Sequence, residues 1–177
     1  MEIRRIPIEE LSDDMFADFH HYQHICRKWA KSDENWILCE TDEVREWNAE
    51  KRRWIPGYLR EQLQRGGILL GAFHEGDLIG FACADGLFHG DEVRYANLTM
   101  LFVDDRWQRK GIGKALFKAM CRLVSVSGTD KLFISAIPSE ETIAFYFSMG
   151  CLDADRIIAE FVDTEHDRYL EFQLNCK

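Results

Sequence analysis

The chain has 177 residues, of which 46% are hydrophobic and 30% are charged. This composition is typical of one folded domain and excludes a disordered chain. The formal net charge of −9 argues against a general nucleic-acid binder, because such a protein needs a basic face. No segment approaches the roughly twenty apolar residues of a membrane span, and the start MEIRRIPIEE has no apolar stretch typical of a secretory signal. We therefore expect a cytoplasmic protein that contacts no membrane.

We find no internal repeat or flexible linker, and we expect a single domain over residues 1–177. The six cysteines are scattered without C-x-x-C pairs, which predicts reduced core thiols rather than disulfides or a zinc site.

In the N-terminal half, the pattern predicts a short strand at Ile3–Pro7 and a helix over residues 12–33 with Ser12 as its N-cap. A second helical stretch is expected over residues 43–67, interrupted at Pro56 and Gly57. Two β-type runs within residues 68–86 flank the turn Glu75-Gly76-Asp77 and predict a hairpin.

The C-terminal half begins with a strand over residues 93–103 that is apolar on both faces, as in a covered central strand. We then expect a helix that stops at Gly128, a buried strand at residues 131–138, and a helix at residues 139–150 that is N-capped by Ser139. Residues 157–174 read as two strands around the polar turn Asp163–Asp167. This order predicts a mixed α/β domain.

The stretch DDRWQRKGIGKALFKAM, residues 104–120, places two glycines at the start of an amphipathic helix and surrounds them with cations. The first turn of a helix carries unpaired N–H groups and the positive end of the helix dipole, which together attract phosphate. Gly111 and Gly113 remove β-carbons that would block the approach, and Arg109, Lys110 and Lys114 add positive charge. The stretch therefore predicts a strand-to-helix turn that holds a pyrophosphate.

The spacing excludes two common nucleotide-binding motifs. A dinucleotide fold uses G-x-G-x-x-G, but position 116 is leucine, and the pattern G-x-x-x-x-G-K-[ST] is missing. The motif that does match is Q-x-x-G-x-G, Gln108–Gly113, behind the strand LTMLFV. Here the chain resembles the GNAT superfamily of acetyl-coenzyme A-dependent N-acyltransferases. A second match is FISAIPSEETIAFYFSMGC, with Tyr146 and Gly150 in the expected places, so the resemblance covers about residues 68–151.

The resemblance implies a single α/β domain whose mixed, mostly antiparallel central sheet is splayed in the middle and flanked by helices. It implies acetyl-CoA as co-substrate, with the pantetheine arm along the backbone of Leu101, Phe102 and Val103. It also implies that Ser139 stands where many relatives carry an asparagine that bonds this arm, and that Phe145 packs near the coenzyme. The N–H groups of the glycine turn would hold the pyrophosphate, so the implied cofactor-binding segment is Gln108, Arg109, Lys110, Gly111, Ile112, Gly113 and Lys114.

The implied reaction is direct attack of a neutral amine on the thioester, without a metal or a covalent enzyme intermediate. Tyr146 would donate a proton to the departing thiolate, since a phenol with a pKa of about 10 stays protonated at neutral pH. A backbone N–H near Phe102 and Val103 would stabilise the negative charge on the carbonyl oxygen. Some relatives carry a glutamate base where this chain has Thr99. The base is left open among the following candidates: Asp85, His89, Glu92, Asp104 and a water chain.

We expect an N-acetyltransferase that acts on a primary amine of a small molecule. Two alternatives stay open: a protein lysine or N-terminal acetyltransferase, and a coenzyme A-binding module without catalysis. The resemblance also implies a homodimer, formed through the C-terminal strands.

Two patterns in the N-terminal third have ordinary explanations. His20 and His24 lie four residues apart, a spacing able to bind zinc, but no third ligand stands out and a solvated helix face is the better interpretation. Aromatic residues gather in the same region, and we assign most of them to the core rather than to an acceptor pocket. They are Tyr22, Trp29, Trp36, Trp47 and Trp54.

Overall fold

A computed structural model describes residues 1–33, 35–86 and 93–174 of the chain. Its centre is a seven-stranded sheet with the order β1-β4-β5-β6-β7-β9-β8. The strands are β1 (Glu2–Arg5), β4 (Ile68–His74), β5 (Asp77–Ala84), β6 (Tyr95–Val103), β7 (Lys131–Ala136), β8 (Leu152–Asp153) and β9 (Arg168–Gln173). All neighbouring pairs are antiparallel except β6 and β7, which are parallel. This confirms the expected mixed sheet.

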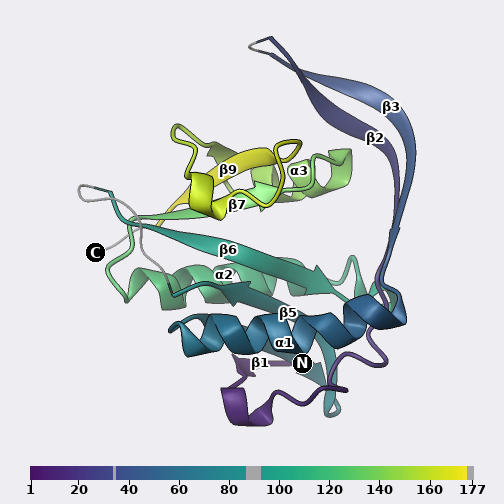
Figure 1. Cartoon of the computed structure of the whole chain (residues 1–177), viewed down its shortest axis with the longest axis vertical. Helices are drawn as coiled ribbons and strands as arrows, with labels where there is room; N and C mark the ends of the chain where they lie inside the picture. The colour runs from purple at the N-terminus through teal and green to yellow at the C-terminus, as the bar shows by residue number, and fades with distance from the viewer. Residues whose placement is uncertain (34, 87–92, 175–177) are drawn as a thin grey trace.

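Three α-helices cover the sheet (Figure 1). They are α1 (Ala49–Gln64), α2 (Ile112–Ser125) and α3 (Glu140–Ser148). On one face, α2 and α3 bury an apolar cluster that includes Leu116, Phe117 and Met120. On the other face, α1 and the N-terminal segment bury a second cluster around Ile55 and Phe81. Each helix therefore packs one apolar side against the sheet, and the sheet separates the two apolar clusters.

A separate two-stranded hairpin stands beside the sheet. Its strands β2 (Tyr22–Ser32) and β3 (Asn35–Glu46) pair with each other and form their own sheet. In Figure 1 the hairpin rises from beside the first residues of α1, passes along the side where β6 and β7 lie apart, and reaches above α3. It thus links the two halves of the molecule.

Several expected elements are confirmed. The turn between β4 and β5 has positive φ at Glu75 (53°) and Gly76 (96°), as a tight hairpin requires. Ser139 caps α3, because its hydroxyl accepts the Thr142 N–H at 3.1 Å. Three 3₁₀ turns complete the pattern: η1 (Ile8–Glu10), η2 (Asp105–Trp107) and η3 (Ala159–Phe161).

The helix expected over residues 12–33 is wrong. Ser12 begins a series of turns, and residues 22–32 form β2. The physical reason is long-range pairing: β2 binds β3 from Tyr22↔Glu46 to Ser32↔Asn35, with a bulge between Ile25 and Arg27. The bulge shifts the alternation of side chains, so the apolar residues fall at a spacing that imitates a helix.

Two other boundaries differ from expectation. The helix α1 starts at Ala49, after the Asn48 N-cap, and continues through Pro56, which lies buried with Ile55 and Leu59. The packing of this face offsets the one hydrogen bond that proline removes. Near the C-terminus, the first of the two expected strands is absent from residues 157–162, where η3 packs Phe161 against Phe133 instead (ring centroids 5.8 Å apart).

The cysteines agree only partly with the expected core thiols. Cys83 and Cys151 are buried and free, whereas Cys26 is exposed on the hairpin, and Cys176 lies outside the described residues. Among the residues described, no helix is long and apolar enough to cross a membrane.

Candidate active site

The two central strands separate partway along the sheet. β6 pairs with β5 from Leu98 to Val103, but with β7 only from Tyr95 to Asn97. Beyond Asn97 the ladder between β6 and β7 ends, and the two strands diverge (Figure 1). One edge of Leu101, Phe102 and Val103 therefore faces a gap, with backbone groups suited to pairing with an extended ligand.

A bulge lies next to the point of separation. The register between β5 and β6 shifts between Cys83 and Ala84, which leaves Thr99 without an opposite residue on β5. The Thr99 hydroxyl donates to the Cys83 carbonyl at 3.3 Å. The bulge bends β6 away from the regular sheet and so helps to open the gap.

The glycine turn leads from the open end of β6 into α2. Gly111 has φ +81° and is the N-cap of α2, without a side-chain hydrogen bond to the first turn. Arg109 also has positive φ (61°). The N–H groups of Ile112, Gly113 and Lys114 lie in the first turn, where a helix offers them no internal acceptor. The turn is therefore a preformed cradle for an anion.

The two glycines serve different purposes in this cradle. At Gly111 space is free, but its φ is one that L-residues adopt at a cost. At Gly113 a Cβ would lie at ordinary contact distance, 3.4 Å from the Phe145 ring and 3.6 Å from Val103. The missing Cβ of Gly113 therefore relieves no clash, and it leaves open space beside the first turn of α2.

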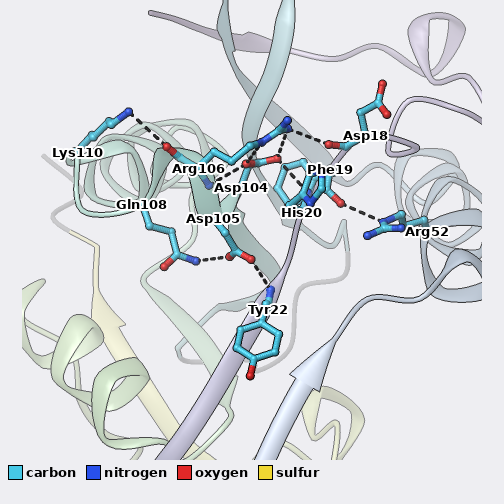
Figure 2. Close-up of polar contacts among 10 residues, drawn as sticks. All are labelled: Asp18, Phe19, His20, Tyr22, Arg52, Asp104, Asp105, Arg106, Gln108 and Lys110. Atoms are coloured by element: carbon cyan, nitrogen blue, oxygen red, sulfur yellow. Dashed lines mark hydrogen bonds and ion pairs between the residues drawn. The ribbon is translucent and has the colours of Figure 1, made fainter.

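A set of polar contacts fastens this turn to the residues just before the hairpin (Figure 2). The fully buried Asp104 carboxylate accepts the His20 N–H at 2.9 Å and the Arg106 guanidinium at 2.7 and 2.8 Å. Burial raises the pKa of Asp104, but the bonds from Arg106 and His20 outweigh burial and hold the pKa below its ordinary value. The ionised Asp104 carboxylate therefore links the loop after β6 to the segment before the hairpin.

Neighbouring residues add further hydrogen bonds to this link. Asp105 accepts the Tyr22 N–H and the Gln108 side-chain amide, the latter at 2.7 Å. The Lys110 ammonium donates to the Arg106 carbonyl at 3.3 Å and lies 4.2 Å from the centre of the Trp107 ring. The glutamine of the motif therefore holds the loop rather than pointing away from it.

Tyr146 lies in the core between α2 and α3. Its ring meets Phe117 and Phe145 edge-on, with centroids 6.1 and 5.1 Å away. Burial raises the pKa of the phenol well above its ordinary value, with a smaller effect from Cys151. The phenol is therefore protonated throughout the neutral range, as a proton donor must be.

Ser139 is buried, and its hydroxyl is already engaged. It donates to the Thr142 hydroxyl at 2.8 Å and accepts the Gln23 amide at 3.0 Å. Because Gln23 belongs to β2, this residue joins the hairpin to the start of α3.

A second polar region lies on the α1 face of the gap. Burial raises the pKa of the Tyr58 phenol of α1, and the nearby Thr99 hydroxyl acts in the opposite direction. Asp163 acts electrostatically on Tyr58 and on Lys51, and burial followed by the charge of Asp167 raises the pKa of Asp163. This face therefore combines hydroxyls with negative charge.

A groove of about 270 Å³ lies beneath the hairpin. Its walls come from the hairpin, from the end of β7 and from the loop before β9. They include Ile25, Lys28, Glu43, Arg45, Pro138, Thr164 and Asp167. Glu43 accepts Arg45 at 2.8 Å, so part of the hairpin charge is neutralised internally.

The candidate bases are placed differently from one another. Asp104 is fully engaged, and Asp85 accepts the Asn97 N–H at 3.2 Å. His89 and Glu92 lie outside the described residues. Thr99 and Tyr58 sit beside the gap, but neither is a base at neutral pH.

The histidines and tryptophans of the N-terminal third also find defined places. His24 bonds Asp42 at 2.7 Å on the exposed hairpin, and the described residues contain no group of three metal-binding side chains. Trp47 is buried, as expected. The guanidinium of Arg168 lies 5.2 Å from the centre of the Trp29 ring and 4.7 Å from that of Trp36, a contact that no local sequence pattern indicates.

Comparison of the sequence with known protein families gives a result consistent with this geometry. The profile of the Acetyltransferase (GNAT) family matches residues 7–150. The chain therefore belongs to the GNAT family and is an acetyltransferase.

Relatives differ in how much of the chain they share. The spermine/spermidine N(1)-acetyltransferase of Bacillus subtilis (strain 168) is 42% identical over 55 residues, which are 29% of this chain and 36% of that protein. The shared segment thus spans about a third of this curated relative.

Solved structures share the fold over nearly the whole chain. Nourseothricin acetyltransferase has a TM-score of 0.70 at 12% identity, with 98% of each chain covered. A putative streptothricin acetyltransferase from Bacillus anthracis str. Ames, solved with acetyl coenzyme A, has a TM-score of 0.64 at 14% identity and covers 97% of this chain and 98% of its own. These likenesses concern the fold.

Proposed function

We propose that this protein transfers the acetyl group of acetyl-CoA to a primary amine of a small molecule, by direct attack within a ternary complex. The observation that carries the proposal is the gap between β6 and β7, which ends at the anion cradle around Gly111. A ligand with an extended arm and a pyrophosphate matches this combination. The relative that acts on spermine and spermidine, and the neighbour solved with acetyl coenzyme A, support it.

The residues of the gap fit the coenzyme by their backbone geometry. Leu101, Phe102 and Val103 offer strand-edge groups to the pantetheine arm, and the first-turn N–H groups of α2 receive the pyrophosphate. The cationic side chains around the cradle are Arg109, Lys110 and Lys114. Phe145, which lies beside Gly113, borders the same space. Ser139 acts here as a positioning residue for α3, because its hydroxyl is bonded within the protein.

The chemistry requires one bond to form and one to break. The neutral amine attacks the thioester carbonyl, a C–N bond forms, and the C–S bond breaks. A backbone N–H near Phe102 and Val103 stabilises the charge on the carbonyl oxygen. The sulfur takes a proton from Tyr146, and the proton that the amine loses restores the balance through solvent. Tyr146 can supply this proton because a phenol stays protonated at neutral pH until the thiolate leaves.

The acceptor side favours a small cationic amine. The groove beneath the hairpin has a volume of about 270 Å³, which suits a small molecule. Glu43 and Asp167 line this groove together with Lys28 and Arg45, and the two carboxylates can contact an ammonium group. The relative named for spermine and spermidine acts on amines of that kind.

The test is thiol release from acetyl-CoA with spermidine, other polyamines, aminoglycosides, amino acids and short peptides, with product mass measured in parallel. Gly111→Val is the control, because its strained φ and added bulk disturb the cradle. We expect release that depends on one class of small amine and is lost in the variant. Transfer to peptides alone would indicate a protein acetyltransferase. Coenzyme binding by calorimetry without any transfer would contradict the enzyme assignment.

A further inference from the structure

Asn97 occupies the point where β6 and β7 separate. It pairs with Phe133 as the last step of the parallel ladder. The alternation of side chains along a strand puts Asn97 on the same face as Tyr95. Tyr95 packs with Phe133 and Phe161 on the side that η3 covers. Asn97 therefore stands at the apex of the gap, on the face that η3 covers.

The side chain of Asn97 is unusual in its hydrogen bonding. The residue is 6% exposed, and its Oδ1 is buried without a hydrogen-bond partner among the residues that the structure describes. Its backbone is satisfied separately, because Asn97 N–H donates to Asp85 Oδ1 at 3.2 Å and Asp85 N–H donates to the Asn97 carbonyl at 3.0 Å. The unpaired atom is thus confined to the carboxamide.

An unpaired buried oxygen destabilises a fold, because it loses water and gains no replacement. An apolar residue of the same size, such as leucine, would suit this buried position better. An asparagine at this point therefore calls for a hydrogen-bond donor that the described residues do not supply.

The surroundings define the chemistry of that donor. Thr99 lies two residues along β6, where its hydroxyl donates to the Cys83 carbonyl at 3.3 Å. Ser135 lies two residues along β7, where its hydroxyl accepts the Asp163 N–H at 3.1 Å and donates to Asp167 at 2.8 Å. Hydroxyls and carboxylates therefore border the apex from both strands. Such a border suits a primary amine, which carries N–H donors and arrives as a cation.

We propose that Asn97 binds the nitrogen of the acceptor, its carboxamide oxygen accepting an N–H of the primary amine while Asp163 provides the negative wall of the site. This inference rests on the proposed function and adds the residue that receives the amine. The terminal torsion of an asparagine is soft, so the oxygen can turn toward the gap. With one N–H held, the lone pair of the deprotonated amine is directed toward the thioester carbonyl.

The test compares Asn97→Leu with Asn97→Asp. Leucine keeps the volume and removes the oxygen, whereas aspartate keeps an oxygen acceptor. With spermidine as the first probe, or the fastest acceptor of the panel in its place, Asn97→Leu should raise the acceptor KM at least tenfold. Its KM for acetyl-CoA should be unchanged. Its melting temperature should not fall. Asn97→Asp should keep acceptor KM within a few-fold of the wild type and move the acidic limb of the pH–rate profile.

The matched control is Glu165→Gln, which removes an exposed carboxylate from the loop that carries Asp163. It should leave acceptor KM unchanged, while Asp163→Asn should raise it. An Asn97→Leu variant that melts higher and keeps its acceptor KM would overturn the inference, since the oxygen would then be only a structural misfit. Failure of the wild type to acetylate any amine would instead overturn the proposed function. If Asn97→Leu does not fold, an unaltered pH profile and a raised acceptor KM in Asn97→Asp would equally contradict the proposal.

Discussion

Asp104 illustrates how one side chain can join two distant segments. Its carboxylate is fully buried, yet it receives the Arg106 guanidinium and the backbone N–H groups of His20 and Arg106. A buried carboxylate is tolerated when such donors surround it. Asp104, the residue that follows β6, thus joins the loop that leads into the glycine turn to the residues just before the hairpin.

We expect Asp104→Asn to lower the free energy of unfolding by about 2 kcal/mol, because an amide cannot accept all of these bonds. The folded-state pKa of Asp104 lies below its unfolded value, so its stabilisation is present above roughly pH 4 and is lost as the pH falls through the folded pKa. Urea unfolding of both proteins at pH 7 and below pH 4 measures the difference. A difference in the free energy of unfolding between the two proteins that increased in acid would contradict this account.

Tyr146→Phe tests the role of the buried phenol. We expect kcat to fall roughly 100-fold, a typical contribution of general acid catalysis, while coenzyme affinity by calorimetry is unchanged. Because burial raises the pKa of Tyr146, the wild-type rate should show no loss of this acid up to about pH 10, where an ordinary tyrosine titrates. Unchanged kcat in the variant would remove Tyr146 from the reaction.

Among single residues, the sequence identified those whose role depends on local structure. Gly111 needs positive φ next to a helix start, and Ser139 caps the helix that follows it. Both signals lie within a few residues of their effect. Asn97 carried no such signal, because its oxygen becomes unusual only when β7 and η3 bury it.

At the scale of elements, the hairpin is the largest departure from expectation. It is fastened at its base by Asp105, along its length by Trp29 N–H donating to the Pro138 carbonyl at 2.7 Å, and near its tip by Arg168. Arg168 also forms a two-fold ion pair with Asp153 at 2.6 and 2.7 Å. The first of these partners lies 83 residues along the chain from the hairpin residue that it contacts, and the others lie farther from theirs, so periodicity within residues 12–33 could not reveal the strand. In contrast, the elements from β4 to α3 were predicted well because their turns and caps are local.

Replacing Arg168 tests how the hairpin is held. Arg168→Met keeps most of the volume and removes the charge that contacts Trp29 and Trp36. Cation–π contacts contribute about 1 kcal/mol or more when shielded from water, so amide exchange in β2 and β3 should accelerate roughly tenfold. Acceptor KM should rise a few-fold. Arg156→Met, at an exposed position in the bend after β8, serves as the control, and equal exchange in both variants would show that the tip is held by other contacts.

For the whole molecule, coenzyme binding should appear as stability. Coenzyme A at a hundred times its dissociation constant should add about 2.7 kcal/mol, which corresponds to a rise of roughly 5–10 °C in Tm for a chain of this length. Differential scanning fluorimetry measures the rise. Gly111→Val should show a much smaller one, and an equal rise in both proteins would place the coenzyme elsewhere.

The separation of β6 and β7 has a further consequence for the behaviour of the protein in solution. An open sheet normally has two free margins, but this one has two more in its interior, along residues 98–103 and the facing part of β7. Free strand margins recruit other chains and promote aggregation. The hairpin crosses the open side of this gap (Figure 1), so it also shields the chain from its own copies. We therefore expect that shortening the ribbon of residues 22–46 would promote aggregation of the protein.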